Sequence, residues 1–299
     1  MPASQTDAYL IEAVARGDPQ AWCEVIERYQ GRLLSFARRR LAQPSEAEDL
    51  VQETFLGLLR SIPNYDRSRS LETYLFAILR NKLNDQFRKL QRGQRQSLDA
   101  CELDEAGQAA VSEETPSRRV ARQETADTQR AALVATLREW VEQCHASRRF
   151  QELIVVEMLV VLGLRNKEVA ADLGLTETAV AGIKFRVLER WRQLAQASSA
   201  ARDWQEADLA ADSSVARIWR EEGVSCLKRS TLGRHLLGAL DDEWSEYVRF
   251  HVEVAGCERC NANLDDLRSE DERDAAAHER LRERCFASSV GFLSRRPEA

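Results

Sequence analysis

A chain of 299 residues exceeds the usual size of one domain, so two or three compact units are expected. Hydrophobic residues make up 43% of the sequence and charged residues 31%, the balance of a soluble globular protein. No apolar run approaches the roughly 20 residues that cross a bilayer, and no basic segment leads into an apolar stretch near Met1. We therefore expect a cytoplasmic protein with no signal peptide and no membrane partner.

The net charge of −6 is unevenly distributed along the chain. Residues 1–95 carry +3 and residues 131–196 carry +1, whereas residues 96–130 carry −4 and residues 197–299 carry −6. Neutralisation of phosphates supplies most of the non-specific affinity for DNA. An acidic protein of this kind should bind DNA weakly by itself, which indicates that it acts with a partner.

Helical patterns dominate residues 1–92, which we expect to form a first domain. Asp18, followed by proline, predicts the start of one helix. Ser45 and Glu48 form the pattern of a capping box, which predicts the start of another. Ser70 is predicted to cap a long helix that ends near the domain boundary.

Residues 93–130 are expected to form a flexible acidic linker, because no basic residue lies between Gln96 and Ser117 and aromatic residues are missing. Helical periodicity resumes at residues 131–197 and predicts a smaller second domain. A polar stretch then leads into residues 198–299, a helical C-terminal extension. The predicted fold class is all-α, with two helical domains joined by the linker and a small helical module at the end.

The clearest local signal is a helix-turn-helix pattern within the second domain. Asn166 is placed to cap a short helix, Gly174 supplies the turn, and Thr176 is placed to cap a second helix. The second helix is expected to expose basic side chains that suit phosphates and guanine edges, namely Lys184, Arg186, Arg190 and Arg192. A helical hairpin with a solvated basic face is the alternative interpretation.

A second basic segment ends the long helix of the first domain. Its basic side chains are Arg80, Lys82, Arg88, Lys89, Arg92 and Arg95. Tyr74 and Phe76 precede them on the same helix, Asn81 offers an amide, and Asp85 opposes the positive charge. Aromatic rings beside a basic stripe suit stacking on unpaired bases. Core aromatics followed by a basic helix end are the alternative.

An acidic surface is predicted on residues 45–60, on the helix that precedes both basic segments. Its first turns carry Glu46, Glu48, Asp49, Gln52 and Glu53, more acid than capping requires. The usual explanation of such a surface is a solvated helix face. The more specific explanation is a docking face for a basic helix of a partner.

The extension contains a candidate metal site. Cys257 and Cys260 form a Cys-x-x-Cys pair, with His251 and Cys226 upstream. Three thiolates and one imidazole would complete a tetrahedral structural zinc site. The seven cysteines of the chain are otherwise scattered, and reduced thiols in a helical core are the alternative.

Residues 7–90 and 131–195 together resemble the extracytoplasmic-function (ECF) group of bacterial RNA polymerase sigma factors. The motif from Glu48 to Phe55 looks like the signature helix of that family. The segment from Ser70 to Asn81 is similar to its promoter-melting helix, and the second domain resembles its −35-reading domain. Tyr74 stands where the family usually has tryptophan, so the promoter sequence is not predicted.

The resemblance implies a non-enzymatic initiation subunit that requires no cofactor and that binds promoter DNA together with the β′ clamp and β flap of core polymerase. It assigns polymerase binding to Asp49, Leu50, Gln52, Glu53 and Phe55. It assigns contacts with the −10 element to Tyr74, Arg80, Asn81, Lys82, Asp85, Arg88 and Lys89. Contacts with the −35 element are assigned to Thr176, Thr178, Lys184, Arg186 and Arg190.

The extension resembles a zinc-binding anti-sigma domain, which implies a structural Zn²⁺ on Cys226, His251, Cys257 and Cys260. Five residues separate His251 from Cys257, where that family has three. Such a shift moves the imidazole about half a turn around a helix, so the spacing leaves metal binding open. The expected role is intramolecular control of the two domains or docking of a regulatory protein.

Two other classes of protein predict different behaviour. A helix-turn-helix repressor or activator would bind duplex DNA tightly without polymerase, and the acidic helix and net charge argue against it. An enzyme is not expected, because the sequence lacks phosphate-cradling glycine loops, nucleophile elbows and His-Glu-x-x-His patterns.

Overall fold

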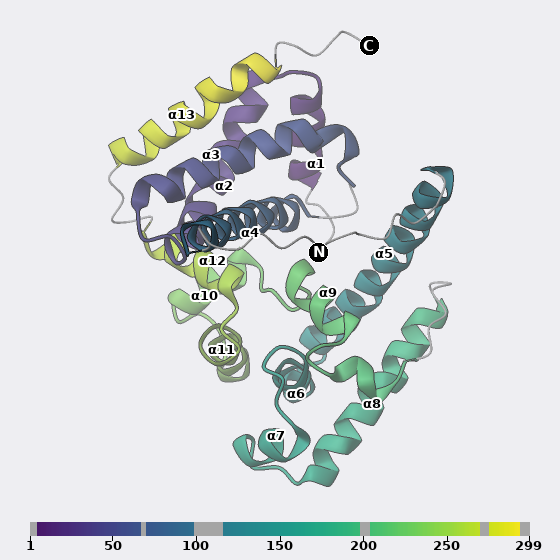
Figure 1. The fold of residues 1–299 in the computed structure, drawn as a ribbon. Coiled ribbons are helices and arrows are strands. Elements are labelled where there is room, and N and C mark those ends of the chain that lie inside the picture. Colours follow the sequence, from purple (N-terminus) through teal and green to yellow (C-terminus); the bar gives the residue numbers. More distant parts are fainter. Residues whose placement is uncertain (1–4, 67–69, 99–115, 198–203, 270–274, 294–299) are drawn as a thin grey trace. The chain divides into compact units, whose positions relative to one another are not determined.

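The computed structural model describes residues 5–66, 70–98, 116–197, 204–269 and 275–293, which form helices joined by turns (Figure 1). No strand occurs among these residues, so the all-α prediction is confirmed. Within the same ranges, every helix is too short or too polar to span a bilayer. The chain divides into two compact units, and each combines segments that are far apart in the sequence.

The first unit comprises residues 1–96, 227–239 and 257–299. Its elements are α1 (Gln5–Ala15), α2 (Pro19–Arg38), α3 (Pro44–Ser61), η1 (Ile62–Asn64), α4 (Leu71–Leu98), α10 (Arg229–Leu236), α12 (Glu258–Ser269) and α13 (Ala275–Leu293). Helices α12 and α13 pack against α2, and α13 also packs against α3.

Two predicted caps start helices of this unit. The Asp18 carboxylate accepts a hydrogen bond from the amide of Gln20 at 2.8 Å, with Pro19 at the first helical position. Ser70 Oγ accepts a hydrogen bond from the amide of Thr73 at 3.2 Å. Each cap satisfies a backbone N–H that has no partner inside its helix.

The capping box predicted at Ser45 and Glu48 is wrong. Helix α3 begins at Pro44, and its N-cap residue Gln43 makes no side-chain capping bond. Proline fixes φ near the helical value and lacks the N–H that a first-turn residue would leave unsatisfied. The helix therefore starts at the proline instead of after the serine.

Aromatic pairs fix how the helices of the first unit cross. Trp22 of α2 meets Phe55 of α3 edge-on, with ring centroids 5.8 Å apart. Phe36 of α2 meets Phe76 of α4 at 5.2 Å. All four rings are buried, so α2 is the central helix onto which α3 and α4 pack.

The second unit comprises residues 97–226 and 240–256. Its elements are α5 (Pro116–Ala146), α6 (Phe150–Val160), α7 (Asn166–Asp172), α8 (Glu177–Ala197), η2 (Glu206–Leu209), α9 (Ser214–Glu222), α11 (Asp242–Arg249) and the π-helical turn η3 (Phe250–Val254).

Four tryptophans build much of the second unit's core. Trp140 of α5 meets Trp191 of α8 at 5.6 Å, and Trp191 meets Trp204 at 5.0 Å. Trp219 of α9 lies 6.2 Å from Trp140. Because Trp204 and Trp219 belong to the C-terminal extension, the extension completes the core around α5 and α8.

The predicted boundaries of the linker differ from the structure. Helix α4 continues to Leu98 and α5 begins at Pro116, so residues 93–98 and 116–130 are helical. Without aromatic residues these segments bury little surface, but they can still form helices because Arg, Gln, Glu and Ala are good helix formers. Residues 99–115, which hold most of the linker's acidic side chains, lie outside the described residues.

The extension was expected as a separate module, but its helices are divided between the two units. Apolar residues of these helices are buried against earlier parts of the chain. Leu281 and Cys285 of α13 enter the core of the first unit, and Trp204 and Trp219 enter the core of the second.

Phe55→Ala should lower the free energy of unfolding by about 3–5 kcal/mol, because it removes a fully buried ring that packs on Trp22. Urea unfolding of the full chain, followed by circular dichroism, measures this change. The matched control on the same helix is Glu46→Ala, at an exposed position, which should stay within about 0.5 kcal/mol of the wild type. Equal stability of the two variants would contradict the assignment of Phe55 to the core.

Candidate functional site

The acidic face of α3 consists of Glu48, Asp49 and Gln52. Asp49 is exposed and the other two side chains are partly exposed, while Val51 on the opposite side of the helix is fully buried. The acidic side chains therefore point away from the core, as the helical spacing predicted. This face is not bare, because Arg284 of α13 binds it.

Other residues of the predicted polymerase surface have different surroundings. The Glu53 carboxylate pairs with the ammonium group of Lys82 of α4 at 2.7 Å. Leu50 and Phe55 are buried to 1% and 0% exposure within the core. The structure thus corrects their assignment as contact residues: both hold α3 in place, and neither presents side-chain atoms to a partner.

Gly57 was missed by the analysis of the sequence. A Cβ atom built at this position would lie 2.9 Å from Cγ2 of Ile78 and 3.2 Å from Cε of Lys82, both on α4. Glycine therefore permits the close approach of α4 to α3 that brings Lys82 within reach of Glu53. A glycine inside a helix lowers stability, so its presence in the predicted helix was a signal of a close contact at this position.

Helix α4 places its predicted −10 residues on a partly exposed surface. Tyr74 is half-buried, with its ring 5.0 Å from that of Tyr65. Asn81 and Arg88 are exposed, and Arg80 is half-buried with its Nε donating to a backbone carbonyl. Lys82 is half-buried in its ion pair.

Three further predictions concern Phe76, Asp85 and Lys89 of α4. Phe76 was expected beside the basic stripe, but it lies in the core against Phe36 and is not available for stacking on a base. Asp85 is exposed and lies 3.8 Å from Arg88, so it partly neutralises that cation. The side chain of Lys89 lies outside the described residues, as do those of Arg92 and Arg95.

The helix-turn-helix is formed by α7 and α8. Gly174 in the turn has φ of +64°, a left-handed conformation that side chains other than glycine's rarely adopt. Thr176 Oγ1 accepts a hydrogen bond from the amide of Ala179 at 3.1 Å, as predicted. Asn166 does not cap α7: the helix begins at this residue, and Arg165 is the N-cap.

The exposed face of α8 is less basic than predicted. Thr178 is exposed, and the Arg186 side chain is 60% exposed with Glu152 at 3.6 Å. Phe185, which the analysis of the sequence missed, is 67% exposed on the same helix. Its position seven residues after Thr178 places both on one face, so helical spacing was a signal that could have found it.

Three basic residues of α8 are held inside the unit, and one of them is Arg192, whose guanidinium donates to the backbone carbonyl of Trp204. Lys184 is buried, and its amine donates to Asn166 Oδ1 at 3.1 Å and pairs with Glu206 of η2. Arg190 Nε donates to Gln143 Oε1 at 2.9 Å. Lys184 was expected to be exposed, and this expectation is wrong because the extension supplies a carboxylate that covers it.

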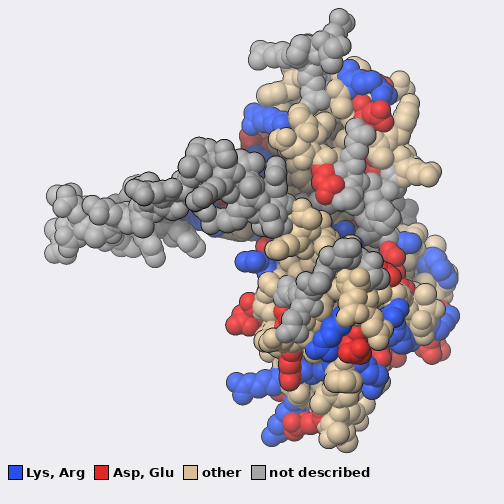
Figure 2. Space-filling model, turned by 90° about the vertical axis from the view of Figure 1, so that its right-hand side faces the viewer, with Lys and Arg blue, Asp and Glu red and all other residues tan. Residues whose placement is uncertain are grey.

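Charges of both signs alternate on the molecular face shown in Figure 2. Over the coloured residues of that face, blue and red side chains are interspersed and do not gather into one large basic region.

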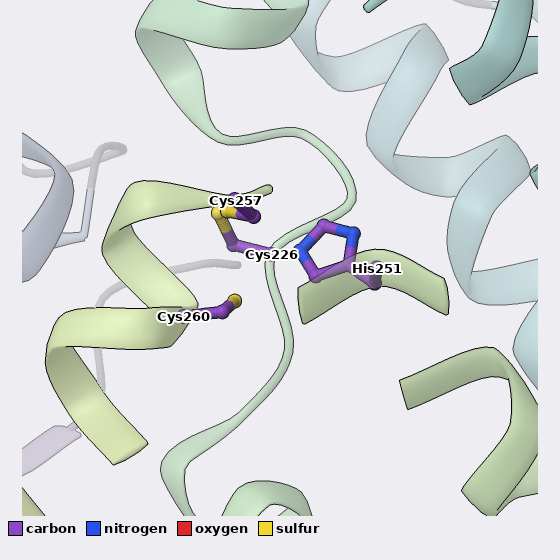
Figure 3. Close-up of side chains that lie close together, drawn as sticks. All are labelled: Cys226, His251, Cys257 and Cys260. Carbon is purple, nitrogen blue, oxygen red and sulfur yellow. The ribbon is translucent and has the colours of Figure 1, made fainter. Parts of the chain in front are cut away.

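Figure 3 shows the four candidate metal ligands gathered together. One ligand atom from each of Cys226, His251, Cys257 and Cys260 lies within 4.8 Å of the others. His251 and Cys260 are buried, and the other two cysteines are partly buried. The backbone amide of Leu227 donates to the Cys260 sulfur at 3.3 Å.

The π-helical turn η3 contains His251. The amide of Ala255 donates to the carbonyl of Phe250, five residues back, at 2.8 Å. A π turn is wider than an α turn, so the angular position of a side chain cannot be projected with α-helical spacing. The five-residue gap before Cys257 therefore does not keep the imidazole away from the thiols.

Glu157 is a further residue that the analysis of the sequence missed. It is fully buried on α6, accepts a hydrogen bond from the Tyr247 hydroxyl at 2.9 Å, and has one carboxylate oxygen 2.9 Å from Nδ1 of His251. The signal was an acidic residue that interrupts the apolar run of residues 153–160. Such a carboxylate requires polar partners when it is buried, and these two residues provide them.

Two helical units, one of them with a helix-turn-helix, form the architecture of a DNA-binding transcription protein. Residues 25–93 match the family model described as Sigma-70 region 2. The ECF RNA polymerase sigma factor SigD of Mycobacterium tuberculosis is 30% identical over 195 residues, which cover 64% of this chain and 84% of SigD. The chain therefore belongs to the ECF RNA polymerase sigma factor family, whose members direct transcription initiation.

Other relatives cover different shares of the chain. RNA polymerase sigma factor CnrH of Cupriavidus metallidurans is 29% identical over 203 residues, 67% of this chain and 99% of CnrH. A probable RNA polymerase sigma factor of Haemophilus influenzae is 38% identical over 64 residues, 21% of this chain and 33% of that protein. No solved structure matches the chain. The comparisons favour a sigma factor over a helix-turn-helix regulator that acts without polymerase.

Two glycine substitutions in the helix-turn-helix should have opposite effects on stability. Gly174→Ala places a Cβ at positive φ and should destabilise the protein by about 1–2 kcal/mol. Gly182→Ala lies inside α8, where its Cβ would meet Arg186 at 3.6 Å, an ordinary contact, and should stabilise it by about 0.5–1 kcal/mol. Urea unfolding of both variants measures the difference, and effects of the same sign would contradict the described turn.

Proposed function

We propose that the chain binds core RNA polymerase through the acidic face of α3 and opens promoter DNA with α4. The main support is the row of Glu48, Asp49 and Gln52, of which Asp49 is exposed and the other two are partly exposed, on a helix that lies within the Sigma-70 region 2 match. A carboxylate row on a rigid helix suits a basic helix of a partner. The β′ clamp is the proposed partner of this face, and the cytoplasm, where polymerase acts, is the proposed location.

For the −10 element, we propose capture of unpaired bases near Tyr74 and Asn81. Tyr74 offers a half-buried ring edge and Asn81 an exposed amide on the same helix. Arg88, about two turns further along α4, is exposed and suits a phosphate. Recognition of single-stranded DNA uses aromatic and amide groups to bind the bases and a cation to bind the backbone.

For the −35 element, we propose that α8 enters the major groove with Thr176, Thr178 and Arg186. These side chains are exposed at the start and middle of the second helix, where helix-turn-helix proteins read base edges. Phe185 adds an apolar group that suits thymine methyls. The second unit is also the proposed site of contact with the β flap.

The net charge explains why such a protein needs polymerase. A chain of −6 with few exposed cations on α8 gains little from phosphate neutralisation. Polymerase then supplies most of the affinity, and the sigma factor supplies base recognition. The proposed role is regulatory and not enzymatic.

Arg88→Glu should lower the rate of open-complex formation about tenfold when the full chain is reconstituted with bacterial core polymerase on its promoter, because it places a negative charge against the DNA backbone. Affinity for core polymerase itself should not change. Arg16→Glu, an equal charge change in the turn that follows α1, is the matched control and should have little effect. Failure of the wild-type chain to bind core polymerase would contradict the proposed function.

We further propose that Cys226, His251, Cys257 and Cys260 bind a structural zinc ion. The donor set of three sulfurs and one nitrogen is one that zinc prefers, and the four groups are already close together. With Nδ1 of His251 donating to Glu157, Nε2 carries the lone pair that a metal requires. Zinc in such a site would stabilise the fold and leave no open position for chemistry.

Purified full-length protein should contain about one zinc ion per chain, because a four-ligand site is complete. Cys257→Ser should remove most of this zinc, while Cys23→Ser on α2, outside the cluster, should retain it. Elemental analysis measures the content, and chelation should lower the melting temperature of the wild type. Equal zinc in the two variants, or none in the wild type, would contradict the site.

We also propose that the extension controls the sigma domains. In the first unit its helices α12 and α13 pack against α2, and in the second unit η2 and α9 pack against α6. The extension also contacts helices that are proposed to bind partners, because α13 packs against α3 and Glu206 of η2 pairs with Lys184 of α8.

A further inference from the structure

Helix α13 lies along α2 and α3 of the first unit in a defined register (Figure 1). Leu281 and Cys285, one turn apart, are buried in the core at 2% and 1% exposure. Ser289, a further turn along, accepts a hydrogen bond from the indole N–H of Trp22. Because these residues follow i, i+4 and i+8 spacing, they form one face of α13 that is seated on the unit.

Arg284, beside this face, binds the acidic face of α3. Its guanidinium donates to Glu48 at 2.9 Å, to Asp49 at 2.8 Å and to Gln52 at 3.3 Å. Arginine carries five N–H donors in a planar fork, which allows one side chain to satisfy three acceptors on adjacent turns. The proposed polymerase-binding face therefore has an internal partner.

Further contacts hold α13 on both sides of Arg284. Arg282 lies 3.6 Å from the carboxylate of Glu27 of α2. Near the other end of α13, the Arg60 guanidinium lies over the ring of Phe292 at 5.2 Å. The direction of α13 across α3 is thus fixed at three points.

We infer that α13 occupies the surface that α3 offers to core polymerase, so that docking of α13 and binding of polymerase exclude each other. This inference rests on the proposed polymerase-binding role of the acidic face. The oxygen atoms of Asp49 and Gln52 that bind Arg284 are the acceptors that a cationic helix of the partner would need. The fit of α13 also defines the partner's chemistry: a helix with an arginine or lysine beside a narrow apolar stripe.

The effect on polymerase binding follows from the population of docked α13. If only a fraction of the molecules has α13 released, the apparent dissociation constant rises by the reciprocal of that fraction. Weakening the docked state should therefore tighten polymerase binding, which is the opposite of what loss of a binding residue would do.

Arg284→Glu in the full chain removes the three contacts and adds repulsion with Glu48 and Asp49. It should tighten binding to core polymerase about tenfold in a direct titration. The matched control is Arg268→Glu, an equal charge change at an exposed position of α12 outside the contacts with α3, which should bind like the wild type. Unchanged or weaker binding by Arg284→Glu would overturn the inference.

The release of α13 is measured separately by thiol labelling, without polymerase. Burial raises the pKa of the Cys285 thiol to about 12, so the thiol should react slowly while α13 is docked. Mass spectrometry should show Cys285 labelled several times faster in Arg284→Glu than in the wild type or in Arg268→Glu. Cys144 of the second unit, also buried with its thiol pKa raised to about 12, is the internal control and should label equally slowly in all three.

The two measurements distinguish the possible failures. Unchanged labelling of Cys285 in Arg284→Glu would show that Arg284 does not hold α13, which overturns the inference. Faster labelling with unchanged polymerase affinity would show that α13 and polymerase use different surfaces, which overturns it as well. If neither the wild type nor any variant binds polymerase, the proposed function fails. The inference that α13 and polymerase exclude each other then fails with it.

Discussion

The contact of Arg284 with the acidic face of α3 joins the C-terminal extension to the surface proposed to bind polymerase. The Arg284 side chain is 44% exposed, so each ion pair contributes at most about 0.2–1 kcal/mol after solvent screening. Burial of Leu281 adds about 1.5–3 kcal/mol. These modest terms favour a docked helix that a larger partner surface can still displace.

The extension is part of the fold of both units. In each unit, complementary charge and apolar burial hold it against earlier parts of the chain. In the first unit, Arg284 neutralises carboxylates that face outward. In the second, Glu206 covers the amine of Lys184, and Trp204 and Trp219 complete the core. Complementary charge and apolar burial therefore bring the extension onto the helices proposed to bind polymerase and DNA.

Much of the fold was predictable because its signals are local. Asp18, Ser70 and Thr176 cap helices as expected, and a glycine at positive φ forms the predicted turn between α7 and α8. Lys184 could not be placed correctly, because the direction of a long side chain depends on a carboxylate 22 residues away. The four candidate metal ligands were named from the sequence, but their spacing left metal binding open, because the π turn at His251 has no simple sequence pattern.

Hydrogen–deuterium exchange of the full chain, measured with and without core polymerase, tests whether polymerase displaces α13 from α3. Amides of residues 279–292 in α13 should lose protection when polymerase binds, because α13 is displaced from α3. Amides of α3 should keep or gain protection, because polymerase takes the place of α13. Unchanged protection of α13 in a saturated complex would show that both bind at once and would contradict the account.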